Sequence, residues 1–93
     1  MQITHEMIGG ESYEYVPLGE FVVRAIGVCG GRPTFKYTRI EVTGALDRLA
    51  AGESLESIVA GYSGRVPREA IQEALDIATR HFINSLPELL VAA

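Results

Sequence analysis

The first forty residues place their apolar side chains in short runs that are typical of β-strands. Residues 13–16 alternate with a period of two and are aromatic or β-branched at three of four positions, and residues 21–26 are a second strand candidate. The segment between them holds a proline and a glycine, so the pattern predicts a β-hairpin through residues 17–20. Residues 34–37 follow a proline and are expected to add a third short extended piece.

From Glu41 onward the apolar period changes to that of an amphipathic helix. Val42, Ala45, Leu46 and Leu49 stand at i, i+3, i+4 and i+7, and Gly52 ends this first helix. Ser54 is suited to cap a second helix, and Pro67 is suited to the first turn of a third. We expect helices of about 10, 9 and 18 residues.

Two short helices joined by a glycine-containing turn, followed by a longer third, form the outline of a helix-turn-helix unit. The sequence predicts a single domain over residues 1–93, in which residues 1–40 are a β-rich N-terminal region. Residues 41–93 are expected to form a three-helix bundle with a short apolar C-terminal tail. The expected fold is mainly α with a small N-terminal β region (α+β), with a homeodomain-like or winged-helix-like core after the β-hairpin.

Charge is distributed unevenly along the chain, although the formal net charge is only −4. Residues 1–23 carry four glutamates and no lysine or arginine, residues 24–48 carry a net charge of +3, and residues 49–93 carry −3. A protein that binds nucleic acid by charge alone would be basic overall. Any contact with nucleic acid must therefore be local, and a dimer would double the number of such contacts.

The content of cysteine and of apolar segments indicates the compartment. A single cysteine excludes an internal disulfide, which favours a reducing environment. Residues 1–15 lack the basic cluster and the apolar core of a signal peptide, and no stretch reaches the roughly 18 apolar residues of a membrane span. We expect a soluble, cytoplasmic protein with no part in the membrane.

Residues 29–33, which read CGGRP, invite comparison with a phosphate-binding loop. Such a loop needs converging backbone N–H groups and a closing Lys-Ser/Thr pair, whereas here a proline without an N–H group follows. A tight turn is the better interpretation. The lone Cys29 and the distant His5 and His81 do not form a metal or catalytic set, so we expect no metal, no cofactor and no enzyme activity.

Arg65, Arg68 and Gln72 stand at the start of the predicted third helix, where a recognition helix contacts DNA. Gln72 lies one turn beyond Arg68 and is able to read adenine. The alternative is a solvated helix face, which acidic residues nearby favour (Glu69, Glu73 and Asp76). A second basic cluster of Arg32, Lys36 and Arg39 is suited either to phosphate contact or to pairing with the acidic N-terminal region.

The end of the third helix and the tail PELLVAA are apolar. Candidate contacts to a partner or a second copy in this region are Phe82, Leu86, Leu89 and Leu90. The segment is suited either to covering the protein's own core or to a symmetric dimer contact.

Residues 26–79 resemble the family filed as domain of unknown function 433. The matching positions are Gly30-Gly31-Arg32-Pro33, Phe35, Thr38-Arg39-Ile40, Val42, Ala51-Gly52, Ser54-Leu55-Glu56, Ile58, Tyr62, Ile71 and Ala74-Leu75. Tyr37 departs from the pattern, because the family usually has glycine before Thr-Arg-Ile. Residues 1–23 lie outside the matching motif.

The resemblance implies a small prokaryotic protein with an antitoxin-like helix-turn-helix fold. Such proteins look like dimeric antitoxins that bind operator DNA, repress their own operon and hold a PIN-like ribonuclease toxin inactive. The alternative is a dimeric protein–protein interaction module without DNA binding, which contacts its partner through the acidic N-terminal segment or the apolar tail.

Overall fold

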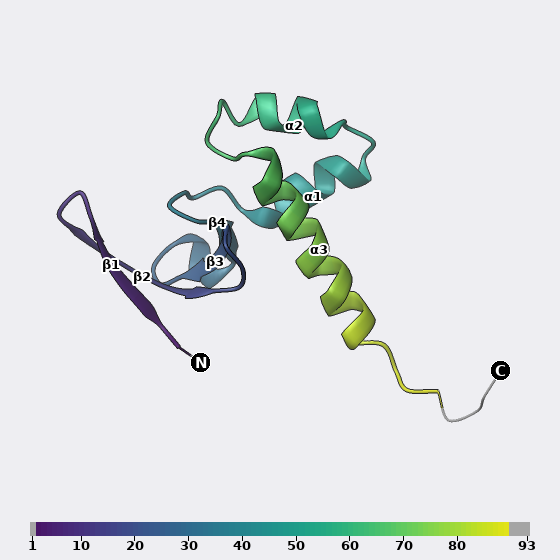
Figure 1. Cartoon of the computed structure of the whole chain (residues 1–93), viewed down its shortest axis with the longest axis horizontal. Coiled ribbons are helices and arrows are strands. Elements are labelled where there is room, and N and C mark those ends of the chain that lie inside the picture. The colour runs from purple at the N-terminus through teal and green to yellow at the C-terminus, as the bar shows by residue number, and fades with distance from the viewer. Residues whose placement is uncertain (1, 90–93) are drawn as a thin grey trace.

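Four antiparallel strands, paired in chain order, form a single sheet (Figure 1). They are β1 (Thr4–Ile8), β2 (Glu11–Pro17), β3 (Val22–Ala25) and β4 (Pro33–Phe35). The computed structural model describes residues 2–89. β1 and β2 form a ribbon that reaches away from the helices, and the 3₁₀ turn η1 (Cys29–Gly31) leads from β3 toward β4.

The expectation of a mainly α protein with a small β region is wrong, because the sheet has four strands and belongs fully to an α+β arrangement. β1 escaped the sequence pattern because it carries no apolar stripe. Its sequence is THEMI, and its side chains are exposed or half-buried on both faces. Backbone pairing with β2, from Thr4 opposite Tyr15 to Ile8 opposite Glu11, makes it a strand.

Within the described residues, three helices follow the sheet: α1 (Val42–Ala50), α2 (Leu55–Gly61) and α3 (Arg68–Asn84). Each is bounded by local signals. Gly52, with a φ of 94°, follows α1, and the Ser54 hydroxyl accepts a hydrogen bond from the Ser57 N–H (3.1 Å) at the start of α2. Pro67 precedes the first turn of α3.

The main core lies between the helices and one face of the sheet. Val22 and Phe35 from the sheet meet Ile58, Ile71 and other helical side chains that are almost fully buried. The opposite face of the sheet has a smaller cluster of Tyr15, Val23 and Ala25. Three of the four side chains of β3 are therefore buried, and Arg24 is the exposed exception.

A carboxylate from α3 ties the helices to the sheet. Glu73 accepts hydrogen bonds from the backbone N–H groups of Glu20 (2.9 Å), Phe21 (2.8 Å) and Val22 (3.0 Å), all in or just after the β2–β3 turn. A Cβ on Gly19 would lie only 2.4 Å from the Glu73 Oε1 atom. Glu73 is therefore a structural residue and not part of a solvated helix face.

An ion pair holds the turn between α1 and α2. Arg48 donates from Nε to Glu53 Oε1 (2.8 Å) and from Nη2 to Glu53 Oε2 (2.7 Å), and its guanidinium lies over the ring of Tyr62. Hydrogen bonds from Arg48 and from the Ser57 hydroxyl lower the pKa of Glu53 to about 2. This pair joins α1 to the turn that precedes α2.

Among residues 2–89, no helix combines the length and apolar character that crossing a membrane requires.

Candidate nucleic-acid interface

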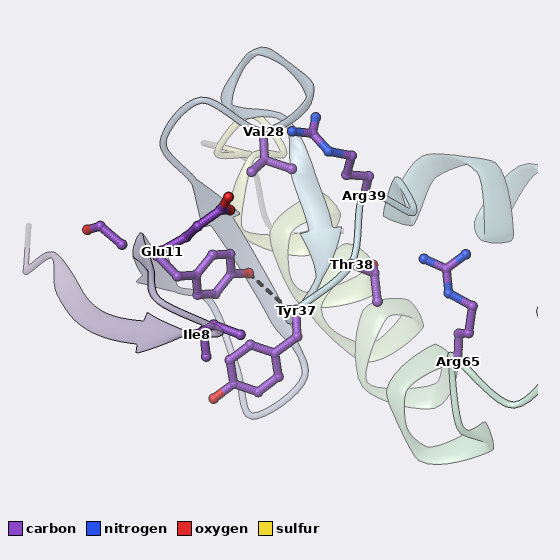
Figure 2. Close-up of a pocket in the computed structure, with 9 residues that line it drawn as sticks. Ile8, Glu11, Val28, Tyr37, Thr38, Arg39 and Arg65 are labelled. Carbon is purple, nitrogen blue, oxygen red and sulfur yellow. Dashed lines mark hydrogen bonds between the residues drawn. The ribbon is translucent and has the colours of Figure 1, made fainter.

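An open pocket of about 300 Å³ lies between the β1–β2 ribbon, the loop after β4 and the segment that enters α3 (Figure 2). Residues of the ribbon line one side, and Thr38, Arg39 and Arg65 line the other. The full lining is Ile8, Glu11, Ser12, Tyr13, Val28, Tyr37, Thr38, Arg39 and Arg65. The pocket thus gathers segments that lie far apart in the sequence.

Arg39 and Arg65 are the notable cations of this pocket. Both side chains are exposed, and neither forms an ion pair with any residue in the range 2–89. The backbone of Arg65 is held by its N–H bond to the Tyr62 carbonyl (3.0 Å) and by the fully buried Val66 that follows. Two guanidinium groups without an ion-pair partner in residues 2–89, against the single carboxylate of Glu11 in the lining, give this pocket a positive balance of charge on an acidic protein.

The loop that carries Arg39 is fixed by its neighbours. The Thr38 hydroxyl donates to the Phe35 carbonyl (2.7 Å) and accepts from the Ile40 N–H (3.0 Å). The Cys29 thiol donates to the Arg39 carbonyl (3.4 Å), which links η1 to the same loop. Gly30 and Gly31 have φ values of 64° and 80°, so the CGGRP segment is a tight turn.

Tyr37 adopts the left-handed backbone conformation, with a φ of 66°. This region favours glycine, and a tyrosine there costs roughly 1–3 kcal/mol. Two contacts offset the strain: the Tyr37 N–H donates to the Tyr13 hydroxyl (3.0 Å; dashed in Figure 2), and the Tyr37 hydroxyl donates to Glu6 Oε1 (2.9 Å). The tyrosine that departs from the family pattern is therefore held by the N-terminal ribbon.

Glu6 is the centre of this network. It also accepts from the Tyr15 hydroxyl, and Lys36 Nζ lies 3.9 Å from its Oε2 atom. The same Lys36 ammonium lies 5.0 Å from the ring centres of Tyr15 and Tyr37. Hydrogen bonds from Tyr15 and Tyr37, and then the charge of Lys36, lower the pKa of Glu6. One carboxylate thus joins β1 to β2 and to the loop after β4.

We expect Glu6→Gln to make the stability of the protein less dependent on pH in the acid range. The folded-state pKa of Glu6 is below its ordinary value of 4.5. The ionised form therefore stabilises the fold above that pH, and the stabilisation is lost as the pH falls through the lowered pKa. Urea unfolding between about pH 6 and about pH 3 should show a shallower loss for Glu6→Gln than for the wild type.

Glu11→Gln is the matched control, because the Glu11 side chain lies on the same ribbon and makes no hydrogen bond within residues 2–89. It should follow the wild-type curve. Equal pH slopes for Glu6→Gln and the wild type would show that the Glu6 network does not stabilise the fold.

The other candidate residues of the basic clusters are engaged within the chain. Arg32 Nε lies 2.6 Å from Glu41 Oε1, which raises the pKa of Arg32 and lowers that of Glu41. Arg68 pairs with Glu56 of α2, and Lys36 belongs to the Glu6 network. Gln72 is exposed on α3. The structure thus brings Arg39 and Arg65 to one pocket and leaves Arg32 outside its lining.

The apolar candidates lie at the far end of α3 from this pocket. Phe82, Leu86 and Leu89 are exposed, and Leu90 lies outside the described residues. Residues 2–89 contain no group of three or more His, Cys, Asp or Glu side chains that could hold a metal ion.

Sequence reasoning missed Glu6 and Tyr13, both in the acidic N-terminal region. The signal that could have indicated them was Tyr37, which stands where the resemblance to the family leads us to expect glycine. A tyrosine in a left-handed backbone conformation needs contacts that hold it there. Its partners were hidden because they stand 24 and 31 positions away.

The family model described as "Protein of unknown function (DUF433)" matches residues 22–78. No curated protein and no solved structure matches the chain. The match runs from the start of β3 into α3 and contains Tyr37, Arg39 and Arg65, whereas β1 and β2 precede it. Because the matched segment covers more than half of the sequence, the protein belongs to the DUF433 family.

Proposed function

We propose that this protein is an antitoxin-like DNA-binding protein of the cytoplasm, which acts as a homodimer on the operator of its own operon. In this role it also holds a PIN-like ribonuclease toxin inactive. The observation that carries the DNA-binding part is the pair Arg39 and Arg65, which flank an open pocket beside the start of α3 without a carboxylate partner in residues 2–89.

The order of α2, a turn and α3 supports this proposal. In helix-turn-helix proteins, the second helix of the unit enters the major groove, and its first residues contact bases and phosphates. Arg65 lies three residues before Arg68, the first residue of α3, and the exposed Gln72 lies one turn further along. The positive end of the helix dipole faces the same region and favours phosphate.

The charge balance favours Arg39 and Arg65 as the residues that contact DNA. Arg68 is neutralised by Glu56, and DNA would have to compete with that carboxylate. Arg39 and Arg65 have no such partner among residues 2–89, so their charge is available to phosphate without breaking an ion pair there. A chain of net charge −4 cannot bind nucleic acid through its overall charge, so binding has to depend on a few local cations such as these two.

We expect the double variant Arg39→Ala/Arg65→Ala to bind the DNA upstream of its own gene roughly tenfold or more weakly than the wild type. A plot of log K against log salt concentration has a negative slope, and the magnitude of that slope should decrease by about 2 per protein copy, because each arginine releases about one counterion. Fluorescence anisotropy with labelled DNA across a salt series measures both quantities.

Arg80→Ala is the matched control, because Arg80 is an exposed arginine on α3 that pairs with Asp76 and does not line the pocket. Its salt slope should match that of the wild type. If the wild-type protein forms no complex with this DNA even at low salt, the DNA-binding proposal fails.

The second candidate, an interaction module without DNA binding, is favoured by the β1–β2 ribbon. The ribbon exposes Glu11 and Glu14, projects from the body and precedes the family match. A basic ribonuclease would fit such a surface. A stable complex with the product of the neighbouring gene, together with no DNA complex at low salt, would select this candidate over the first.

A further inference from the structure

The end of α3 and the residues after it form an apolar projection that the rest of the described chain, residues 2–89, leaves exposed. α3 leads away from the sheet and the other helices, and the chain continues outward beyond it (Figure 1). Phe82 is 63% exposed, Leu86 50% and Leu89 83%. We call these three residues the C-terminal strip. Apolar side chains gathered in this way on a small protein mark an interaction site.

The overall dimensions agree with an extended shape of the described chain. The Cα radius of gyration is 15.4 Å, and the principal extents are 57 × 34 × 20 Å. A compact domain of this length has a radius of gyration of about 12 Å. The excess reflects the two outlying parts, the β1–β2 ribbon and the end of α3.

An apolar groove of about 560 Å³ runs beside the earlier part of α3. Its walls come from the β2–β3 turn and β3, from α1 and from α3, and include Leu18, Val22, Leu46, Ala74, Ile77 and Ala78. The groove reaches His81, which immediately precedes Phe82 of the C-terminal strip. One chain therefore carries both an apolar projection and an apolar groove.

The charges of the groove and of the projecting segment are complementary. The charged or ionisable residues that line the groove are Arg24 and His81, with no carboxylate among the lining residues. Arg24 donates to the Gly31 carbonyl (2.6 Å) and has no acidic partner within residues 2–89. Residues 82–89 contain a single charged side chain, Glu88, between Leu86 and Leu89. An apolar segment with one acid thus matches an apolar groove whose arginine has no carboxylate partner within residues 2–89.

We propose that two copies of this chain form a two-fold dimer, in which the C-terminal strip of each copy occupies the apolar groove of the other. Glu88 then lies against Arg24 of the second copy. Both contacts form twice, as a closed two-fold interface requires. This inference deepens the homodimer of the proposed function and rests on that part of it alone.

The arrangement has a consequence for DNA binding, and this consequence does rest on the proposed function. Pairing the ends of two α3 helices directs their starts, with Arg65, toward opposite ends of the dimer. Phe82 lies 14 positions after Arg68, which corresponds to about 21 Å of helix. Two such lengths, shortened by tilt, are comparable to the roughly 34 Å between half-sites one DNA turn apart.

Size-exclusion chromatography with light scattering and analytical ultracentrifugation of the full chain test the interface. The wild type should be a dimer. Leu89→Asp should weaken the dimer roughly tenfold or more, because a charge replaces an apolar contact in the groove. Leu89 is exposed and lies outside every helix and strand, so this substitution leaves the fold of one copy unchanged. The far-ultraviolet circular dichroism spectrum of Leu89→Asp should therefore match that of the wild type.

A charge exchange tests the orientation of the strip in the groove. Glu88→Arg and Arg24→Glu should each weaken the dimer, and the two substitutions together should restore it. Met7→Asp is the matched control, because Met7 is an apolar residue with 62% exposure on β1, away from the groove. It should leave the dimer intact.

A monomeric wild type would overturn the interface. A dimer that survives Leu89→Asp, or that Met7→Asp disrupts instead, would overturn it as well, because the contact would then lie on another face. DNA binding is measured on the same proteins. A monomer that binds DNA would refute the interface but not the DNA proposal, and a dimer that Leu89→Asp separates but that binds no DNA would support the interface alone.

Discussion

Glu73→Ala is expected to lower the free energy of unfolding by about 3 kcal/mol, since it removes a charged acceptor and leaves the backbone N–H groups of the β2–β3 turn without their partner. The Glu73 carboxylate receives three such bonds, at 2.8–3.0 Å, from Glu20, Phe21 and Val22. Two of these donors are half-exposed or exposed, so water replaces part of the loss. Urea unfolding monitored by circular dichroism measures the change.

Glu69→Ala is the control for this substitution, because Glu69 lies one turn earlier on α3 and is exposed. Its loss should cost less than about 1 kcal/mol, from the helix dipole alone. The loss of unfolding free energy for Glu73→Gln should lie between those for Glu73→Ala and Glu69→Ala, because an amide oxygen keeps one neutral acceptor. A Glu73→Ala protein as stable as Glu69→Ala would mean that the turn is held by other contacts.

Ile71→Ala should cost about 3–4 kcal/mol of unfolding free energy, because it opens a cavity at a site that cannot collapse. Ile71 is fully buried on α3 and packs in the cluster that joins the sheet to all three helices. The control is Ile26→Ala, since Ile26 is 60% exposed after β3 and should lose less than about 1 kcal/mol. Thermal and urea unfolding of both variants compare the two sites. Equal losses of unfolding free energy in the two variants would contradict the role of Ile71 in the core.

The helices were predictable from the sequence almost to their ends. The apolar spacing from Val42 to Leu49 gave α1, and Ser54 and Pro67 marked the starts of α2 and α3. These signals act within one or two turns of backbone, so they survive in any tertiary context. The loop of Gly30 and Gly31 was predictable for the same reason, because a left-handed turn is a local property.

The candidate site was predictable only in part. Arg39 and Arg65 were recognised as cations, but so were Arg32, Lys36 and Arg68, and the sequence offered no means to separate them. Each ion pair that neutralises the latter three joins residues between 9 and 30 positions apart. The choice of partner depends on which elements pack together, which residue types alone do not reveal.

Local patterning was therefore sufficient for the three helices, the tight turn after β3 and membership of the family, because each depends on residues close together in the chain. Long-range contact was needed for the remainder. β1 is a strand because β2 pairs with it, Tyr37 tolerates its backbone because Tyr13 and Glu6 hold it, and Glu73 acts across 51 to 53 positions. A polar side chain shows its role only when its partner is in place, because hydrogen bonds and ion pairs act over a few ångströms of space and are independent of distance along the sequence.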